Sequence, residues 1–375
     1  MTKDIQKLLG TRDKKTEGQI LYDLAIIGAG PAGSSLARIL AQKQPALKIL
    51  LLDGQKEGRG KPCGGLLSPD AQKALKRQGL DLPVSVLVGP TISGIRTLDL
   101  VSGLSRFYRR NYLNMDRSAF EDWLLSLALA FDQVEYVRSG CRHIKSLGDK
   151  YELKVANQAT YYAKNLVGAD GAASLVRRTF LPKNIPDRYV AIQEWYWAKQ
   201  SRRPMFYCLF DQETSPSCSW LFQKQNQLAY GGAFQGQGCR KAFARQKAKF
   251  SKAEGYDLTQ PLRLEACLVV NPRHWSDFAF GLTGVYLIGE AAGMISASSY
   301  EGFSYALESA DLLARAFDPT DPQKTLALYR RSSLPLRLKL WSKIVKKNII
   351  FKPSLRSFIM RLGLGSSGER INEFR

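Results

Sequence analysis

The chain has 375 residues, 45% of them hydrophobic, and 55 Lys and Arg against 33 Asp and Glu give it a net charge of +22. A chain of this length and composition buries a sizeable core, and we expect two or three structural units. The six cysteines form no Cys-x-x-Cys pair and the apolar runs are shorter than a membrane span, which argues against a zinc site, a disulfide scaffold and a spanning helix. The polar N-terminal segment lacks the pattern of a signal peptide, so we expect a cytoplasmic protein.

A short apolar run near the N-terminus ends in a glycine-rich turn and is followed by a helical pattern. The pattern predicts a buried parallel strand over residues 22–27 and a helix over residues 31–41. Glycines let the chain turn sharply and let a pyrophosphate approach the helix N-terminus, where free N–H groups and the helix dipole favour negative charge. The residues expected to contact a dinucleotide at this turn are Gly28, Ala29, Gly30, Pro31, Ala32 and Gly33.

The next predicted strand, "LKILLLD", ends at Asp53, 20 residues beyond Gly33. A carboxylate at this point accepts hydrogen bonds from ribose hydroxyls in dinucleotide-binding proteins. A strand, a glycine turn, a helix, a second strand and an acid in this order predict a dinucleotide site. The pattern alone does not separate NAD from FAD.

Two distant segments complete a set of three fingerprints. "LVGADGAASLVRR" (166–178) runs from a predicted strand into Asp170-Gly171, and "GLTGVYLIGEAAGMISASSYEG" (281–302) has an acid after a strand and then a small-residue turn. Together with the first turn, they resemble the FAD-dependent monooxygenase and geranylgeranyl-reductase superfamily, with its GxGxxG, "DG" and "GD" motifs. In that family the first motif holds the ADP part of FAD, and the acid of the third lies on the ribityl chain. The resemblance thus implies further FAD contacts at Asp170, Gly171, Gly289, Glu290, Gly293, Met294 and Gly302.

Two details qualify this resemblance. The family usually has Asp where this chain has Glu290, so the carboxylate lies one methylene further from the backbone. Arg117, in "NMDRSAFEDWL", resembles the family's Arg-x-x-Phe-(Asp/Glu)-x-x-Leu segment, which begins a helix along the cofactor. We therefore expect Arg117 to contact FAD as well.

Two other segments resemble the geranylgeranyl reductases. "CSWLFQKQNQLAYGGAF" (218–234) matches most of their Tyr-x-Trp-x-Phe-Pro signature, with Cys218 in place of Tyr and Gln223 in place of Pro. In those reductases this strand lines the cavity for an isoprenoid chain, and a Cys-Gly-Gly loop lies near the flavin ring. The resemblance implies substrate contacts at Cys218, Trp220 and Phe222, and cofactor contacts at Lys61, Pro62, Cys63, Gly64 and Gly65.

Candidate catalytic residues are fewer. Cys63 is either a proton donor or orienting contact at the ring, or a small residue in a tight loop. Trp220 is expected in the pocket, and Tyr300 follows the flavin turn and could reach the ring. Neither of the two histidines, His143 and His274, has a partner pattern, so we expect no metal site.

The predicted fold class is α/β: a Rossmann-like FAD-binding domain interleaved with a mostly antiparallel β-sheet substrate domain, followed by C-terminal helices. The predicted FAD-binding domain comprises residues 22–85, 116–185 and 280–320. The predicted substrate domain comprises residues 86–115 and 186–279, and residues 321–375 form a basic helical region.

The C-terminal region carries half of the excess positive charge, because residues 323–375 hold 13 Lys and Arg against 2 acidic residues. In "LRLKLWSKIVKKNII" apolar residues recur at helical spacing, and most of the remaining positions are basic. Such a helix either packs its apolar stripe on its own domain or lies in an anionic membrane surface through residues 336–356. No nucleic-acid-binding motif is visible, so we do not expect a nucleic-acid partner.

The sequence thus predicts an FAD-dependent oxidoreductase that reduces C=C bonds of an isoprenoid or other apolar lipid. The alternative is an NAD(P)H-dependent flavin monooxygenase of an apolar substrate. The chain has no second GxGxxG unit, so we expect no dedicated nicotinamide domain, and either enzyme could accept electrons from transiently bound NADPH or NADH or from a small protein. A third interpretation is a membrane-associated flavoprotein with a binding or regulatory role.

Overall fold

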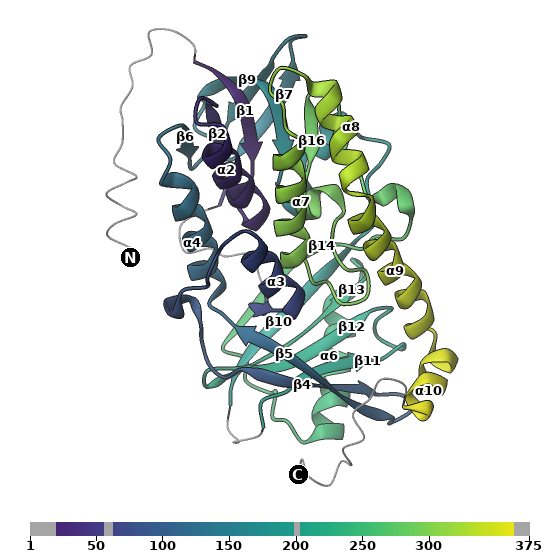
Figure 1. The fold of residues 1–375 in the computed structure, drawn as a ribbon. Helices are drawn as coiled ribbons and strands as arrows, with labels where there is room; N and C mark the ends of the chain where they lie inside the picture. Colours follow the sequence, from purple (N-terminus) through teal and green to yellow (C-terminus); the bar gives the residue numbers. More distant parts are fainter. Residues whose placement is uncertain (1–19, 56–62, 199–202, 364–375) are drawn as a thin grey trace.

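The structure is a computed structural model and describes residues 20–55, 63–198 and 203–363. Two eight-stranded sheets, built from interleaved parts of the chain, form its framework (Figure 1). In the view of Figure 1 the first sheet lies in the upper part of the molecule, and the second sheet crosses the lower part. The C-terminal helices run along one edge of both. The chain thus has the mixed α/β architecture that the sequence predicts.

The first sheet is a parallel dinucleotide-binding sheet with an antiparallel hairpin attached. Its main path runs β15-β16-β9-β1-β2-β6, and the five strands from β16 to β6 pair in parallel. The hairpin consists of β7 and β8, and β8 also pairs with β9. The central strands β1 and β2 are buried along most of their length, as apolar strands covered on both faces should be. The strands are β1 (Leu21–Ile27), β2 (Ile49–Leu52), β6 (Val134–Val137), β7 (Cys141–Ser146), β8 (Tyr151–Val155), β9 (Thr160–Gly168), β15 (Gly281–Leu282) and β16 (Val285–Leu287).

Helices cover this first sheet, and α2, α4 and α7 begin near the carboxyl ends of its strands. The predicted first helix is confirmed as α2, which begins at Pro31 after the N-cap residue Gly30 and packs between α4 and α7. Ser68 and Asp116 cap α3 and α4 by accepting hydrogen bonds from Ala71 N–H and Ala119 N–H. The helices are α2 (Pro31–Lys43), α3 (Pro69–Arg77), α4 (Arg117–Leu129), α5 (Leu175–Phe180) and α7 (Phe303–Ala316).

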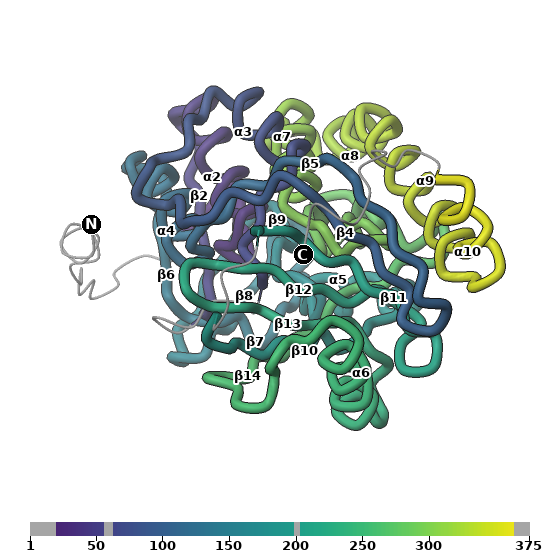
Figure 2. Tube along the Cα trace, turned by 90° about the horizontal axis from the view of Figure 1, so that it is seen from below, coloured from purple at the N-terminus to yellow at the C-terminus, as the bar shows by residue number. Residues whose placement is uncertain are grey.

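The second sheet is antiparallel except where β4 and β11 pair in parallel. Its order is β14-β10-β13-β12-β11-β4-β5-β3. One face packs on α6, and the opposite face is turned toward the first sheet (Figure 2). The elements are β3 (Leu66–Leu67), β4 (Ile92–Asp99), β5 (Ser105–Asn114), β10 (Arg188–Trp197), β11 (Phe206–Phe210), β12 (Cys218–Lys224), β13 (Gln227–Phe234), α6 (Cys239–Glu254) and β14 (Arg263–Val270).

One strand departs from the predicted division of the chain. Residues 22–85 were assigned to the FAD-binding domain, yet β3 pairs with β5 in the second sheet through Leu66–Asn114 and Leu67–Leu113. A two-residue strand carries no recognisable alternation, so only its tertiary partner reveals which sheet it joins. As a result, the loop before β3 is attached directly to the roof of the cavity described below.

The C-terminal helices α8 (Pro322–Ser332), α9 (Leu334–Ile350) and α10 (Pro353–Leu362) follow one edge of the molecule (Figures 1 and 2). The apolar stripe predicted for α9 is split in two. Leu336, Leu340 and Ile344 are buried, while Trp341 and Val345 are exposed. None of the helices in the described residues combines the length and the apolar character needed to cross a membrane.

Candidate active site

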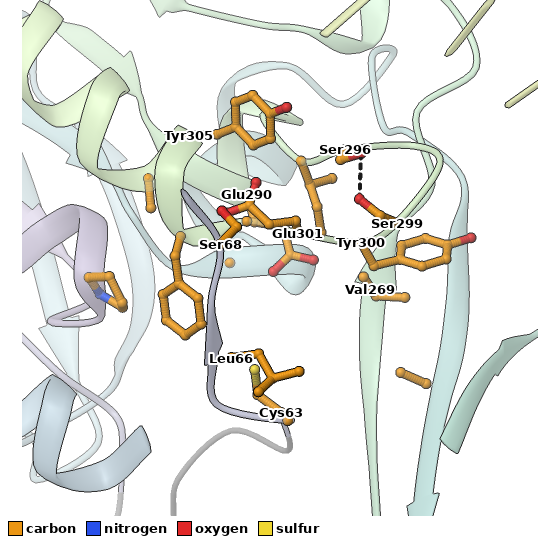
Figure 3. A pocket seen from close by; sticks show the side chains of 18 of the residues that line it. Cys63, Leu66, Ser68, Val269, Glu290, Ser296, Ser299, Tyr300, Glu301 and Tyr305 are labelled. Carbon is orange, nitrogen blue, oxygen red and sulfur yellow. Dashed lines mark hydrogen bonds between the residues drawn. The ribbon is translucent and has the colours of Figure 1, made fainter. Parts of the chain in front are cut away.

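A cavity of about 1150 Å³ lies between the two sheets. Its lining comes from the first glycine turn, the carboxyl ends of β2 and β9, the turn before α7 and the inner face of the second sheet. In open and mixed α/β sheets this edge, at the carboxyl ends of the strands, is where ligands bind. Figure 3 shows one part of the cavity, where segments far apart in the sequence meet.

The glycine turn leaves room for a ligand only at one of its three glycines. A Cβ built on Gly28 would lie 2.5 Å from the Ala169 carbonyl oxygen, and Gly28 has a φ of +105° that disfavours other residues. A Cβ on Gly33 would lie 1.9 Å from the Gly28 carbonyl oxygen. A Cβ on Gly30 would meet nothing within 4 Å, because this residue faces the cavity. Gly28 and Gly33 therefore shape the turn, and Gly30 keeps the approach to it open.

The N-terminus of α2 offers unsatisfied donors to that open space. No side chain caps it, and no acidic residue lies in its first turn. The first N–H groups of a helix have no partner within the helix, and the dipole makes this end positive. The geometry therefore fits a pyrophosphate at this point.

Asp53 follows the carboxyl end of β2 and lines the same part of the cavity. One carboxylate oxygen accepts a hydrogen bond from Gln55 N–H over 3.2 Å. Burial raises the pKa of this carboxyl group. The position fits a ribose-binding acid, because hydroxyl donors would satisfy a carboxylate that is partly removed from water.

The acid of the "DG" motif supplies a direct test of whether the cavity suits a polar cofactor. Asp170 Oδ2 accepts hydrogen bonds from Leu175 N–H (2.6 Å) and Val176 N–H (3.3 Å), which caps α5. Its Oδ1 is buried and has no partner within the described chain. A buried carboxylate oxygen without a donor is costly, and a ligand hydroxyl in the cavity would satisfy it.

Glu290 occupies the position of the family's ribityl-binding acid, but one of its oxygens is already engaged. Oε1 accepts a hydrogen bond from Val270 N–H of β14 over 3.0 Å, so the longer side chain connects the two sheets. The other oxygen is turned toward Gly171, where a Cβ would lie 4.0 Å away. One face of this carboxylate still borders the cavity, which accommodates the Asp-to-Glu departure.

The Cys63 loop contacts the second sheet and the start of α4. Cys63 Sγ accepts a hydrogen bond from Gly65 N–H over 3.4 Å, and a Cβ on Gly64 would lie 2.6 Å from the Phe222 ring. Arg117 binds Glu121 through Nε (3.0 Å) and Nη2 (2.5 Å). Although burial opposes the charge on Arg117, the neighbouring Cys63 and Glu121 raise its pKa above the usual value. Cys63 thus lies at the cavity wall beside a permanent cation.

Lys224 is a residue of this loop region that the sequence analysis missed. It lies on β12 two residues after Phe222 and four after Trp220, so all three side chains are on the same face of the sheet. This spacing of two could have revealed it. Its ammonium group donates a hydrogen bond to the Met115 carbonyl oxygen over 2.7 Å. Burial lowers the pKa of Lys224 to about 8. The lysine secures the Cys63 loop, because a Cβ on Gly65 would lie 2.4 Å from its Nζ.

The inner face of the second sheet forms an aromatic wall. Trp220 donates a hydrogen bond from its indole N–H to Gln193 Oε1 over 3.0 Å and lies across Gly231, where a Cβ would be 2.6 Å from the indole nitrogen. Phe206 stacks on Phe222 with ring centroids 6.1 Å apart. The small residues of β13 therefore leave space for Trp220, and the wall favours an apolar ligand.

The turn before α7 places a tyrosine and a glutamate at the cavity. Tyr300 has a φ of +53°, and its hydroxyl accepts a hydrogen bond from Ser217 Oγ over 2.7 Å, so its ring extends away from Cys63 (Figure 3). Glu301 is half-buried and caps α7 by accepting hydrogen bonds from Ser304 N–H and Oγ. Burial raises the pKa of Glu301, so its carboxyl group stays protonated to higher pH than usual.

The structure brings together most of the residues selected from the sequence. Of these, the cavity wall contains Gly28, Ala29, Gly30, Pro31, Ala32, Asp53, Cys63, Gly64, Gly65, Arg117, Asp170, Gly171, Trp220, Phe222, Glu290, Tyr300 and Gly302. Gly33, Gly289, Gly293 and Met294 lie behind this wall, and Lys61 and Pro62 lie outside the described residues.

Cys218 differs from its predicted role as a substrate contact. It is buried, its thiol donates a hydrogen bond to the Ser298 carbonyl oxygen over 3.7 Å, and it is absent from the cavity wall of the described chain. Cys208 of the neighbouring strand lines the cavity instead. Alternation places both cysteines on the same sheet face, and the Ser298 segment covers only Cys218. No group of three His, Cys, Asp or Glu side chains within the described ranges could hold a metal ion.

Comparisons with solved structures support this architecture. A geranylgeranyl bacteriochlorophyll reductase-like protein from Thermoplasma acidophilum superposes with a TM-score of 0.79 over 96% of this chain and 94% of its own, at 18% identity. pqsL from Pseudomonas aeruginosa, a probable FAD-dependent monooxygenase, superposes with a TM-score of 0.69 over 92% of this chain and 99% of its own, at 15% identity. The fold is therefore that of FAD-dependent oxidoreductases.

A sequence comparison identifies nearer relatives, whereas no family model matches the chain. Protein CbrA of Escherichia coli O9:H4 (strain HS) is 43% identical over 350 residues, which cover 92% of this chain and 94% of the relative. CbrA of Shigella flexneri serotype 5b (strain 8401) shows the same identity and coverage. The chain therefore belongs to the CbrA family.

Proposed function

We propose that the protein binds one FAD and reduces carbon–carbon double bonds of an isoprenoid or similarly apolar lipid. The observation that carries the proposal is the single cavity that joins a nucleotide-binding turn to an aromatic wall. When bound and reduced, FAD supplies the hydride for such a reaction. The protein has to hold the cofactor, exclude water from the substrate and supply a proton.

The polar end of the cavity suits the cofactor. The uncapped N-terminus of α2 would hold the pyrophosphate, and Asp53 would accept hydrogen bonds from a ribose. Asp170 Oδ1 has no partner within the described chain, so it fits a hydroxyl of a polyhydroxylated chain, and Glu290 lines the same part of the cavity. These donors and acceptors are appropriate for FAD. The buried Asp170 Oδ1 in particular has no other hydrogen-bond partner in the described chain.

The apolar end suits a lipid. Phe206, Trp220 and Phe222 line it, and no cation or carboxylate alternates with them along β12 before Lys224. Transfer from water to such a wall lowers the free energy of a hydrocarbon. The same transfer raises the free energy of a polar molecule whose hydrogen bonds are not replaced. An isoprenoid chain therefore fits this wall better than a sugar or an amino acid does.

Two groups at the wall can supply the proton. Cys63 lies in the loop secured by Lys224 and Phe222, and Glu301 is a half-buried carboxylic acid whose pKa is raised by desolvation. A carboxyl group with a raised pKa is better suited to general acid catalysis than an ordinary one. The sequence analysis selected Cys63, and the structure adds Glu301 as a second candidate.

Replacing Cys63 with alanine is expected to leave the affinity for FAD within about twofold of the wild-type value. Because the variant lacks the thiol proton, turnover should be slower by about 10²-fold or more. The measurement is single-turnover reoxidation of the reduced protein by substrate, followed by flavin absorbance. Glu301→Gln is the matched variant, because glutamine preserves the side-chain length and can still accept a hydrogen bond from Ser304 N–H. Unchanged turnover in C63A with slow turnover in E301Q would transfer the role to Glu301.

The reaction itself is tested by incubating the reduced protein under anaerobic conditions with a panel of polyprenyl lipids. A mass gain of two hydrogens per reduced bond is expected, and the Gly30→Val variant provides the cofactor-free control. The proposal fails if no lipid of a broad panel gains mass in the presence of correctly folded, FAD-loaded protein. Assays with NADPH, NADH and a chemical reductant identify the electron donor separately.

The alternative function is hydroxylation of an apolar substrate by an NAD(P)H-dependent monooxygenase. The shared fold with pqsL favours it over unrelated chemistries. The same substrate panel, supplied with oxygen and labelled ¹⁸O₂, separates the two reactions. Incorporation of one labelled oxygen would establish the monooxygenase and contradict the reductase.

A further inference from the structure

The outward face of α9 and α10 carries a continuous row of exposed apolar side chains. Eight of the 21 large hydrophobic side chains that are exposed in the described residues fall on these two helices. Leu338 is 54% exposed and Phe358 is 61% exposed. Such a concentration marks an interaction surface rather than ordinary scatter. We call this surface the outer row: Leu334, Leu338, Trp341, Val345, Ile349, Leu355, Phe358 and Leu362.

The outer row is distinct from the face that packs on the protein. Leu336, Leu340 and Ile344 of α9 are buried against the core of the first sheet. The outer residues of α9 follow the same helical repeat on the opposite side, so α9 is apolar on two faces. A helix on the surface of a globular domain needs only one apolar face. Trp341 of this second face packs edge-on against Trp275, with ring centroids 6.0 Å apart, and the remaining outer residues require a partner outside the core.

The charge around the outer row indicates the kind of partner. Residues 334–362 contain eight Lys and Arg and no Asp or Glu. Within the described chain Lys343 and Lys346 form no ion pair, whereas Lys339 lies 3.6 Å from Asp70. A twofold contact between two copies would place these basic surfaces against each other, which is unfavourable. An anionic surface, in contrast, would be attracted.

The same two helices also close the end of the cavity away from the glycine turn. Their inward residues Lys343, Lys346, Ile350, Arg356, Ile359 and Met360 line that cavity. In Figures 1 and 2, α9 and α10 form the outer edge of the molecule, beside β4 and β11. A partner on the outer row would therefore lie next to the apolar end of the cavity.

We propose that α9 and α10 dock the protein on the surface of an anionic lipid bilayer, with the outer row in the boundary between headgroups and acyl chains. Basic helices with an exposed apolar face and a tryptophan bind membranes in this way, in the plane of the interface. Lys346 is exposed on the flank of α9, where it can contact the headgroup layer, whereas Lys343 is half-buried at the cavity wall. The bilayer is therefore the reservoir adjoining the cavity.

Vesicle co-sedimentation of the full-length protein tests the proposal. Phosphatidylcholine vesicles with about 30% phosphatidylglycerol are expected to bind the protein at least about tenfold more tightly than pure phosphatidylcholine vesicles, because of the basic helices. The triple variant Leu338→Gln/Val345→Gln/Phe358→Gln should lose about tenfold or more of that binding. Raising the salt to about 1 M should weaken wild-type binding, since screening acts on the lysines.

The matched control changes three exposed leucines elsewhere, Leu262→Gln/Leu264→Gln/Leu268→Gln, at or beside the edge strand β14. This control should bind vesicles as the wild type does. Far-UV circular dichroism and thermal unfolding confirm that all variants are folded. Equal binding by the outer-row variant, or no binding by the wild type, would overturn the proposal. If the wild type and the control variant form a dimer without lipid and the outer-row variant is a monomer, the surface would instead be assigned to a contact with a second copy.

Discussion

Replacing Gly30 with valine is expected to abolish FAD retention while leaving the fold of the protein intact. A Cβ at Gly30 would meet no atom within 4 Å, and its φ of −66° is open to any residue, so valine fits the backbone. Its branched side chain would instead occupy the space where a pyrophosphate approaches α2. We expect FAD affinity to fall by about a hundredfold or more, which equals about 2.7 kcal/mol.

Titration of the protein with FAD, followed by flavin fluorescence, measures this loss. Gly33→Val provides the contrast, because a Cβ at Gly33 would lie 1.9 Å from the Gly28 carbonyl oxygen and should destabilise the turn itself. Thermal unfolding without FAD should therefore match wild type for G30V and fall for G33V. A G30V protein that retains FAD at wild-type stoichiometry would contradict the position given to the pyrophosphate.

Removal of the Asp99 carboxylate is expected to cause the largest loss of stability. Asp99 Oδ2 accepts a hydrogen bond from Arg356 Nε over 2.8 Å, and both side chains are almost completely buried. Asp99→Ala would leave the guanidinium buried without its partner, which typically costs about 3–5 kcal/mol. This pair also attaches α10 to the end of β4, so the loss should release the C-terminal helices first.

Urea unfolding at several pH values measures this effect. Burial raises the pKa of Asp99, but the hydrogen bond from Arg356 and the nearby charge outweigh it and leave the pKa below its usual value. A carboxyl group with a lowered pKa in the folded state stabilises above its unfolded pKa of about 3.9 and loses that contribution as the pH falls. In Asp99→Ala the free energy of unfolding should therefore fall less steeply with decreasing pH than it does in the wild type. A loss below about 1 kcal/mol at neutral pH would contradict the buried ion pair.

The nucleotide end of the site could be predicted from sequence because its determinants are local. The first strand, the glycine turn and α2 are consecutive; Gly28 and Gly33 have local steric reasons, and Gly30 borders open space in the cavity. The same holds for Asp53, since the carboxyl end of one parallel strand lies beside that of its neighbour. Family resemblance was needed to select FAD over NAD at this stage.

The apolar end could be predicted only in part. The resemblance to the geranylgeranyl reductases assigned Trp220 and Phe222 to the wall, but it assigned Cys218 in the same way, and the segment at Ser298 that covers Cys218 is a tertiary contact. The split of the α9 stripe follows from what packs against the helix, which the sequence periodicity does not contain. The sequence likewise gives no sign that α9 and α10 line the cavity, because they follow the residues of the aromatic wall by more than 100 residues along the chain.

The central claim is that distant segments of one chain combine to bind a single FAD next to an apolar substrate wall. The most direct measurement is the amount of flavin bound per chain after purification and reconstitution with FAD, determined by absorbance of the released cofactor and of the protein. We predict one FAD per chain in folded wild-type protein and none in Gly30→Val. Folded wild-type protein that remains colourless after incubation with FAD would contradict the account.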